Sequence, residues 1–447
     1  MPGDSALPLL ATADVVVVGA GSAGSSAAIG AARTGASVIL VEKLPFLGGS
    51  STAVLDTFYG FFTPGTRARK VVGGIPDAVV AGLRGLGPVV ERPNTYGAGT
   101  GITYHPDHLK VTWERLVTDA GVRVLLHAFL QAVEVRDGRV AGIVVATKAG
   151  PGRIAGSVFI DASGDADLCH HAGFGYERAG EIDPAQTATT TFKVVNVDLA
   201  RRRTITTKEL HARMAEAADS GAYDLPRREG SDHITPVDGM TATVMTRLDT
   251  VRTVDGVLVT ATDPWLLTEL EIAGRRQALE YVRFLVDRVP GYEHAALGGL
   301  SVGIGVRETR RVFGDVRVTR DDVLAARRFP DEIGLCGAPI EDHRGGPDTR
   351  WAYLPDGAVV GIPWRSLLVR DAANVLVAGR CFSATHDAHA SIRSMGQTMA
   401  MGQAAGTGAA LAVAAGRDPR ALDPELLRAR LRADGALLEP VDPEPAP

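Results

Sequence analysis

The stretch Asp14-Val-Val-Val-Val-Gly19-Ala-Gly21-Ser-Ala-Gly24-Ser-Ser-Ala-Ala28 decides the fold of this chain. Four consecutive valines are typical of a fully buried parallel strand, and the small residues after them predict a tight turn into a helix. Gly19 permits the sharp turn, Gly21 lets a pyrophosphate approach the backbone, and Gly24 lets the helix pack against the strand. We therefore predict a dinucleotide-binding unit; the alternative is a glycine-rich turn of purely structural use.

The residues around this turn complete the binding pattern. Val38-Ile-Leu-Val-Glu42 predicts a second buried strand that ends in an acid, and Glu42 is placed to accept the hydroxyls of an adenosine ribose. The helix start at Ser22 and Ala23 offers N–H groups and a positive dipole end to phosphates. Further cofactor contacts are predicted in the following loop at Lys43, Gly48, Gly49 and Ser50.

The composition is that of an ordinary globular protein. The chain has 447 residues, of which 45% are hydrophobic and 22% charged, enough for two or three domains. A net charge of -5 gives no reason to expect nucleic acid or an anionic membrane as a partner. Three separated cysteines, no secretory signal and no run of ~20 apolar residues lead us to expect a soluble cytoplasmic protein. The oligomeric state stays open.

Alternating apolar residues predict an antiparallel β-meander after the first α/β unit. Its strands are expected at Ala132–Arg136, Val140–Thr147 and Ile154–Ile160, separated by two glycine-containing turns. Helical periodicity over Pro106–Ala120 and a short strand at Val122–Leu126 precede it. A parallel sheet interrupted by a meander that returns the chain to the sheet is common in FAD-binding folds.

We predict an α/β protein with a discontinuous, Rossmann-like FAD-binding domain and an inserted α+β substrate domain. The FAD-binding domain is expected to comprise residues 14–172 and 365–420, with the substrate domain at 173–364 and flexible ends at 1–13 and 439–447. Expected strands and helices of the second half are Thr187–Val197, Thr207–Gly221, Met240–Thr246, Pro264–Val289, Ser301–Val306, Asn374–Gly379 and Ser394–Ala415.

Two further elements are expected to face the cofactor. One is the strand end at Asp161–Gly164, where small residues let the backbone approach a flat ring system. The other follows the strand at Asn374–Gly379 and continues to the start of the long helix, whose N-terminus would stabilise a reduced, anionic flavin. The predicted contacts are Ala162, Ser163, Gly164, Gly379, Arg380, Gly396, Gln397 and Thr398.

With these elements in place, the chain resembles the FAD-dependent oxidoreductases that are distantly related to the flavoprotein subunits of succinate dehydrogenase and fumarate reductase. Besides Val15–Gly24 with Glu42, the resemblance rests on Phe46–Gly49, Val158–Asp165, Gly305–Arg311, Ala378–His386, Met395–Gln397 and Met401–Gly406. It implies FAD as the cofactor and redox chemistry on a small organic substrate.

The candidate catalytic residues flank the cofactor elements. His386 and His389 are expected in a polar loop, Ala384–Arg393, where a histidine would accept the proton that accompanies hydride removal. Arg393 is a candidate for holding a substrate carboxylate or a flavin oxygen. The alternative for each histidine is a structural hydrogen bond, and for Arg393 a structural ion pair.

Arg307 is the remaining candidate, within Val306-Arg-Glu-Thr-Arg-Arg311. A strand period would place Arg307 and Arg311 on one face, with Glu308 and Arg310 on the other. One face would then clamp an acidic substrate, and the equally open alternative is an ion pair that anchors the inserted domain.

These observations lead to one main hypothesis and two alternatives. The main hypothesis is an FAD-dependent dehydrogenase or oxidase that takes a hydride from a small polar or anionic substrate onto flavin N5, with oxygen or a separate carrier as electron acceptor. The alternatives are an NAD(P)H-fed monooxygenase or reductase and a non-catalytic flavin-binding protein. A second glycine turn and a closely spaced cysteine pair are both absent from the sequence. No metal site is predicted, because the adjacent ligands of Cys169-His170-His171 point in different directions.

Overall fold

The computed structural model describes residues 7–65, 68–92, 101–346 and 349–442. The N-terminal part of the chain is built around one seven-stranded sheet. From one edge to the other, the strands of this sheet are β6 (Arg123–Leu125), β2 (Val38–Val41), β1 (Leu9–Val18), β9 (Gly150–Asp161), β8 (Arg139–Thr147) and β7 (Phe129–Arg136), and β22 (Val375–Val377) pairs with β9. β1 pairs in parallel with β2 on one side and β9 on the other, and β2 pairs in parallel with β6.

β9 joins the meander to the parallel sheet. Its first half pairs antiparallel with β8, from Gly150 to Ala155, while its last residues, Phe159 to Asp161, pair in parallel with β22. The side chain of Asn374, just before β22, bonds the backbone of Val140 in both directions at 2.9 Å and so ties the two parts together. The predicted meander and the Rossmann-like α/β fold are confirmed.

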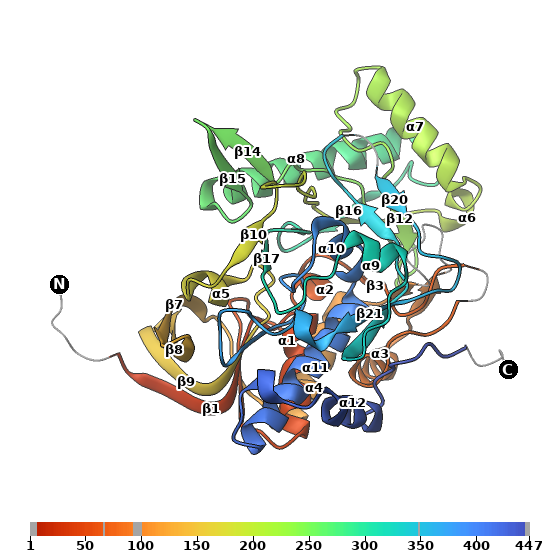
Figure 1. Cartoon of the computed structure of the whole chain (residues 1–447). Helices are drawn as coiled ribbons and strands as arrows, with labels where there is room; N and C mark the ends of the chain where they lie inside the picture. The colour runs from red at the N-terminus through yellow and green to blue at the C-terminus, as the bar shows by residue number, and fades with distance from the viewer. Residues whose placement is uncertain (1–6, 66–67, 93–100, 347–348, 443–447) are drawn as a thin grey trace.

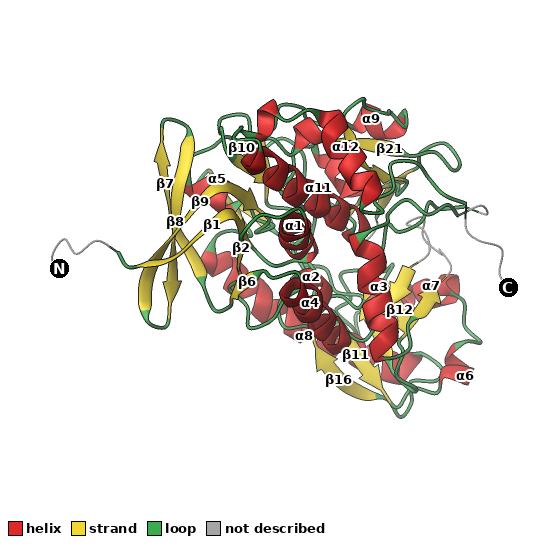
Figure 2. Cartoon of the chain, turned by 90° about the horizontal axis from the view of Figure 1, so that it is seen from below, coloured by secondary structure: helices red, strands yellow, loops and turns green. Residues whose placement is uncertain are grey.

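Two helices of small residues pack closely against each other beside this sheet. They are α1 (Ser22–Arg33) and α11 (Met395–Ala414), which Figure 2 shows side by side near the centre of the molecule. A Cβ atom at Gly402 or Gly406 would overlap the carbonyl oxygen of Ala23 or Ala27. The glycines of the predicted long helix therefore let two backbones approach each other.

The middle of the chain forms separate apolar clusters at the top of Figure 1. There α7 (Thr207–Asp219) and α8 (Pro264–Arg288) accompany the four-stranded sheet of β12 (Ser231–Ile234), β13 (Thr241–Val244), β11 (Phe192–Val195) and β16 (Ala296–Leu300). Buried apolar residues from Val312 onward pack into the core of the large sheet instead. The boundaries of the inserted domain stay a prediction.

The other elements are short and connect or cover these layers. The helices are α2 (Ser50–Ala53), α3 (Ile75–Leu86), α4 (Pro106–Asp119), α5 (Asp167–His171), α6 (Leu199–Arg202), α9 (Arg320–Leu324), α10 (His386–Ile392) and α12 (Pro424–Ala433). The strands are β3 (Thr57–Phe58), β4 (Val90–Arg92), β5 (Gly101–Thr103), β10 (Tyr176–Arg178), β14 (Val251–Val254), β15 (Val257–Thr260), β17 (Arg310–Val312), β18 (Glu332–Cys336), β19 (Ile340–Asp342), β20 (Arg350–Ala352) and β21 (Val360–Pro363). The described helices include none with the length and hydropathy of a transmembrane span.

Three local predictions were wrong. Ser301–Val306 is not a strand, because Ser301 and Gly305 bond the segment 189–191 while Val302 between them bonds Ala53, which interrupts the ladder. The polar loop at Ala384–Arg393 is instead mostly helix α10. The expected long strand at Thr187–Val197 shrinks to the four residues of β11.

Candidate active site

A cavity of about 820 Å³ brings the predicted cofactor elements together. The turn between β1 and α1, the end of β9, the residues after β22 and the start of α11 all contribute to its wall. The opposite wall comes from the middle of the chain, including Val302–Arg307. The cavity therefore lies where parallel strands end at their carboxyl edge, the usual place for ligands in such sheets.

The glycine turn leaves bare backbone at the cavity. Gly19 has a φ of +91°, and a Cβ atom there would lie 2.5 Å from the carbonyl oxygen of Ala162. Gly21 bridges to Gly48 in parallel, and a Cβ atom at Gly49 would lie 2.8 Å from Gly21 Cα. A side chain has no room in this cradle, which fits a pyrophosphate at the N-terminus of α1.

The carboxylate of Glu42 is held in place at the same cavity. Its Oε2 atom accepts the backbone N–H of Ala20 at 2.7 Å, and its Oε1 atom accepts that of Leu44 at 2.9 Å. The side chain is buried and lines the cavity. Each oxygen keeps a further lone pair, so the group fits the two hydroxyls of a ribose.

Fifteen of the predicted cofactor residues line the cavity: Gly19, Gly21, Ser22, Ala23, Glu42, Lys43, Gly48, Gly49, Ser50, Ala162, Ser163, Gly164, Gly379, Arg380 and Thr398. Gly24 does not, because it packs against the carbonyl of Gly19. Gly396 and Gln397 also lie outside it: Gly396 donates to Tyr59 O at 3.0 Å, and Gln397 Nε2 donates to Gly60 O at 2.7 Å. These two residues fasten α11 to the segment before it.

Arg380 is anchored beside the cofactor elements. Its Nη2 atom lies 2.7 Å from Asp165 Oδ1, and its Nη1 atom donates to Thr309 Oγ1 at 3.0 Å. Burial alone would raise the pKa of Asp165, but Arg380 and Lys43 outweigh it and lower that pKa. Arg380 thus holds an ionised carboxylate at the cavity wall.

Two arginines line the other end of the cavity. Arg307 Nη1 donates to the carbonyl of Thr187 at 2.7 Å, and Arg393 Nη2 donates to Gln186 Oε1 at 3.0 Å. Burial lowers the pKa of Arg393, and burial together with Arg393 and Arg227 lowers the pKa of Arg307 well below its usual value. Several cations therefore share one small volume.

Arg311 does not share a face with Arg307, so that part of the prediction was wrong. β17 covers only Arg310–Val312, and the backbone before it is not a strand. Arg311 points away from the cavity and forms buried ion pairs with Glu308 and Glu177. Arg310 bonds Asp165 O and Asp167.

Several polar residues at this end were not predicted from the sequence, among them Glu341, His343 and Thr349. Burial would raise the pKa of Glu341, but His343, Arg393 and Arg307 lower it to about 2. Burial and Arg307 lower the pKa of His343 well below its usual value. The only sequence signal was the polar run Glu341-Asp-His343, which lacks periodicity and carries no known spacing.

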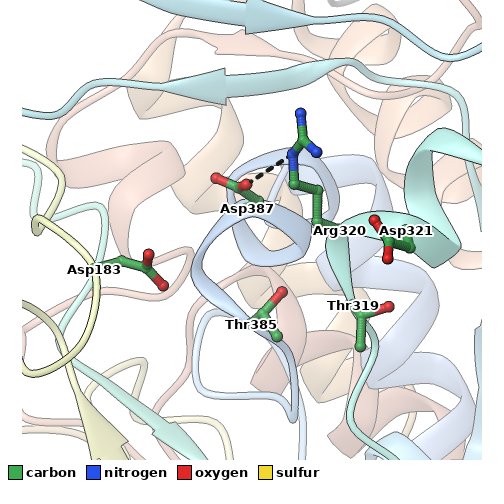
Figure 3. A pocket seen from close by; sticks show the side chains of 6 residues that line it. All are labelled: Asp183, Thr319, Arg320, Asp321, Thr385 and Asp387. Atoms are coloured by element: carbon green, nitrogen blue, oxygen red, sulfur yellow. Dashed lines mark ion pairs between the residues drawn. The ribbon is translucent and has the colours of Figure 1, made fainter.

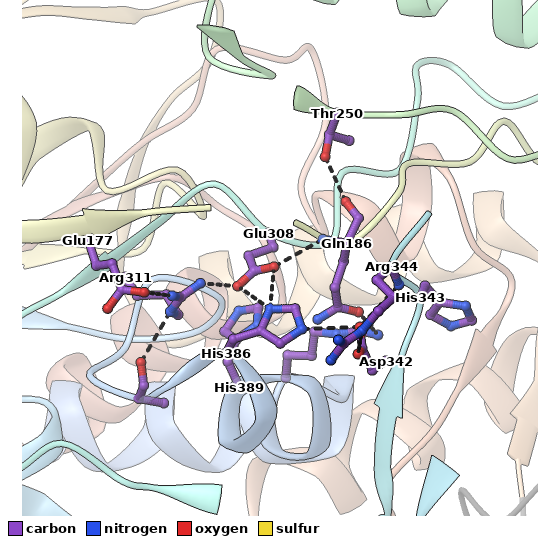
Figure 4. A network of polar contacts seen from close by, with 12 residues as sticks. Glu177, Gln186, Thr250, Glu308, Arg311, Asp342, His343, Arg344, His386 and His389 are labelled. Atoms are coloured by element: carbon purple, nitrogen blue, oxygen red, sulfur yellow. Dashed lines mark hydrogen bonds and ion pairs between the residues drawn. The ribbon is translucent and has the colours of Figure 1, made fainter. Parts of the chain in front are cut away.

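Neither predicted catalytic histidine lines the cavity. His386 is buried between two carboxylates, with Nδ1 3.0 Å from Glu308 and Nε2 3.1 Å from Asp342 (Figure 4). His389 Nε2 donates to the carbonyl of Arg380 at 2.8 Å, and burial with nearby arginines lowers its pKa well below its usual value. Both histidines sit behind the wall that Arg393 forms.

A smaller pocket of about 220 Å³ lies apart from this cavity and shares no lining residue with it (Figure 3). Arg320 on its rim lies 3.1 Å from Asp387. Within the described ranges, donor atoms of Asp342, His386 and Asp387 lie within 4.8 Å of one another, but each already has an ionic partner. The absence of a metal site stays a prediction.

Short segments of curated proteins match this chain. The fumarate reductase (cytochrome) of Shewanella frigidimarina is 47% identical over 60 residues, which are 13% of this chain and 10% of that protein. A probable fumarate reductase of the same organism is 60% identical over 40 residues, or 9% of this chain and 7% of that protein. The chain thus spans about a tenth of the length of these relatives.

Solved structures match over most of the chain at low identity. A geranylgeranyl bacteriochlorophyll reductase-like protein from Thermoplasma acidophilum aligns with a TM-score of 0.46 and 14% identity, covering 94% of this chain and 83% of that one. The p-nitrophenol 4-monooxygenase PnpA from Pseudomonas putida aligns with a TM-score of 0.45 and 12% identity, covering 91% and 80%.

The family comparison covers nearly the whole chain. The model of a family described as FAD dependent oxidoreductase matches residues 14–431, which include every wall of the large cavity. The glycine cradle and the anchored Glu42 fit the pyrophosphate and the ribose of a dinucleotide such as FAD. The chain belongs to the FAD-dependent oxidoreductase family, and FAD is its cofactor.

Proposed function

We propose that this enzyme oxidises a small anionic organic substrate whose charge is held by Arg307 and Arg393. FAD, when bound, supplies the acceptor for a hydride at N5 of its ring system. The observation that carries the proposal is the meeting of two half-buried arginines with the cofactor elements in one cavity. The electron acceptor, oxygen or a separate carrier, stays a prediction.

The charges around the two arginines support an anionic ligand. The pKa of Arg393 and that of Arg307 are both lowered by burial, so each guanidinium gains from a further negative partner. Arg393 Nε and Gln186 Nε2 are buried donors that bond no acceptor among the described residues. A carboxylate bound at Arg393 would satisfy such a donor and form the charge-assisted bonds that guanidinium groups prefer.

The start of α11 supports the placement of the reaction next to these arginines. Ser394, Met395 and Thr398 from its first turns line the cavity directly after Arg393. A helix N-terminus carries a partial positive charge, which stabilises negative charge that develops beside it. Arg393 and this helix end therefore favour an anionic substrate and electron uptake at the same place.

The experiment is a binding comparison on the FAD-loaded protein. Small mono- and dicarboxylates are titrated in, and the perturbation of the flavin absorbance reports their Kd. We expect Arg307→Gln and Arg393→Gln each to weaken binding by about 30-fold or more, since losing one partner of a buried charge pair costs about 2 kcal/mol or more.

Arg252→Gln serves as the control, because Arg252 is about half exposed on β14 and pairs with Glu269, and neither residue lines the cavity. Its carboxylate affinity should equal that of the wild type. Equal carboxylate binding by all four proteins, or binding of the neutral amides as tight as that of the acids, would contradict the proposed function.

A further inference from the structure

A chain of three side chains at the cavity resembles the arrangement that activates a hydroxyl group. His343 Nε2 lies 2.9 Å from Glu341 Oε1, and His343 Nδ1 lies 3.1 Å from Thr349 Oγ1. All three residues line the cavity that holds the cofactor elements and the two arginines. A carboxylate, an imidazole and a hydroxyl in series form a path along which a proton can move.

The β19–β20 hairpin sets this geometry. Glu341 pairs with Trp351 across the two strands, while His343 directly follows β19 and Thr349 directly precedes β20, at the end where the strands are connected. The carbonyl of His343 accepts both the backbone N–H and the hydroxyl of Thr187, at 2.9 and 3.0 Å. The imidazole is therefore fixed at its backbone and at both ring nitrogens.

The protonation states of these three side chains set the direction in which a proton can move through them. Because the pKa of Glu341 is about 2, its carboxylate accepts, and His343 Nε2 must carry the hydrogen. Because the pKa of His343 lies well below its usual value, the ring is neutral at pH 7 and Nδ1 holds a lone pair. The Thr349 hydroxyl then donates to Nδ1, and its oxygen is left to accept a proton from the cavity side.

We propose that Thr349 and His343 relay the hydroxyl proton of a small hydroxy carboxylate during its oxidation, with Glu341 as the positioning residue that holds the imidazole. This inference rests on the proposed function, and it adds a substrate class and a base. The carboxylate binds the arginines, and the substrate O–H points at Thr349. Thr349 is the catalytic residue that touches the substrate.

The step balances in atoms and electrons. The substrate O–H proton passes to Thr349 Oγ1 as the Thr349 proton passes to His343 Nδ1. The hydrogen on the neighbouring carbon would leave with its two electrons, for which bound FAD would supply the acceptor, and a C=O bond would form on the substrate. The product is the oxo carboxylate, and the imidazolium of His343 is stabilised by the Glu341 carboxylate beside it.

The electrostatic surroundings of His343 keep its imidazole neutral and therefore able to accept a proton. Burial lowers the pKa of His343 most, Arg307 and Arg227 lower it further, and Glu341 opposes them. Arg247 Nη2 reaches Thr349 Oγ1 at 3.4 Å, which favours an oxygen that carries partial negative charge. These charged groups predict a base that stays neutral down to pH values below 6.5.

The first test uses matched variants of the FAD-loaded enzyme. Anaerobic flavin reduction by a panel of hydroxy carboxylates is followed by stopped flow, together with the Kd of the corresponding deoxy carboxylates. We expect Thr349→Val and His343→Gln to slow reduction by about 100-fold or more with the Kd unchanged, and Thr349→Ser to stay within about 3-fold of the wild type.

The second measurement needs no substrate. Nitrogen NMR of histidine-labelled holoenzyme, with His343→Gln to assign the signal, reports the tautomer of His343. We expect a neutral ring at pH 7 with the hydrogen on Nε2. An imidazolium at pH 7, or a hydrogen on Nδ1, would overturn the relay whatever the substrate is.

The outcomes separate this inference from the proposed function. Flavin reduction by hydroxy carboxylates that is equally fast in wild type and Thr349→Val overturns the relay and leaves the arginine site standing. Flavin reduction only by saturated carboxylates that lack a hydroxyl also overturns the relay and leaves the arginine site standing. Failure of every carboxylate to bind in an arginine-dependent way overturns the proposed function and the relay together.

Discussion

The Nδ1 atom of His386 lies 3.0 Å from the Oε2 atom of Glu308, and both side chains are almost completely buried. Glu308 also bonds Arg311, which in turn bonds Glu177, so Figure 4 shows one continuous ionic network behind the cavity wall. His386 starts α10, the helix that ends just before Arg393. The network therefore fixes the position of Arg393, which lines the cavity, from behind.

Removing Glu308 should destabilise the protein strongly. Glu308→Ala leaves the buried Arg311 and His386 each without one partner, and such a loss typically costs about 3–5 kcal/mol of the free energy of unfolding. Urea denaturation of the FAD-loaded protein measures the change. The control is Glu269→Ala, because Glu269 pairs with Arg252 in solvent and exposed pairs contribute about 1 kcal/mol or less. Equal midpoints for the two variants would contradict this account.

The contact between α1 and α11 gives a second prediction. Gly402→Ala places a methyl group against the carbonyl of Ala23, so we expect a loss of about 1–3 kcal/mol in stability and weaker FAD retention. Gly85→Ala in α3 meets no atom within 4 Å and should stabilise by about 0.5–1 kcal/mol. Thermal melts of both variants measure these changes in stability. An unchanged melting temperature for Gly402→Ala would show that the helices can separate freely.

Glu42 gives a prediction about cofactor affinity. Glu42→Ala removes the proposed ribose acceptor and leaves the N–H groups of Ala20 and Leu44 without their carboxylate. We expect the Kd for FAD to rise by about 10-fold or more, which corresponds to about 1.4 kcal/mol. Fluorescence titration of the apoprotein measures it, with the exposed Glu114→Ala as the control. An unchanged Kd would show that Glu42 does not contribute to FAD binding.

Buried neutral histidines predict loss of stability in acid. Burial, followed by Arg311, Arg393 and Arg380, lowers the pKa of His389 in the folded protein. The unfolded chain takes up this proton near pH 6.5 and the folded chain does not, so stability falls as the pH drops below about 6.5. His389→Gln should reduce the slope of melting temperature against pH between 7 and 5. An identical slope would mean that His389 is protonated in the folded protein.

The cofactor half of the site could be predicted from sequence because local rules determine it. The turn from Gly19 to Gly24 needs specific glycines for steric reasons, and Glu42 follows a recognisable buried strand. The meander followed from alternation and turn residues, and β9 returned to the sheet as expected. These features depend on neighbours in the chain.

At the other end of the cavity, Arg307 and Arg393 were predicted as candidate site residues. The polar residues that they meet there could not be predicted, because this end of the cavity is assembled from distant segments. Arg307 and Arg393 meet Glu341, which is close to neither in sequence, and the β19–β20 hairpin that brings Glu341 has strands of three residues. His386 and His389 were singled out for their place near a cofactor strand, yet the helix α10 turns both into the interior. Short range patterns do not report which way a helix faces when its neighbours lie far along the chain.

The central claim, that FAD here accepts a hydride from an anionic substrate at Arg307 and Arg393, has one direct test. The purified FAD-loaded enzyme is titrated anaerobically with hydroxy carboxylates, with their neutral amides and with NADPH, while the flavin absorbance is followed. We predict bleaching by one or more of the acids, none by the amides, and a loss of that bleaching in Arg307→Gln and Arg393→Gln. Bleaching by NADPH alone, or equal bleaching by acids and amides in all variants, would contradict the account.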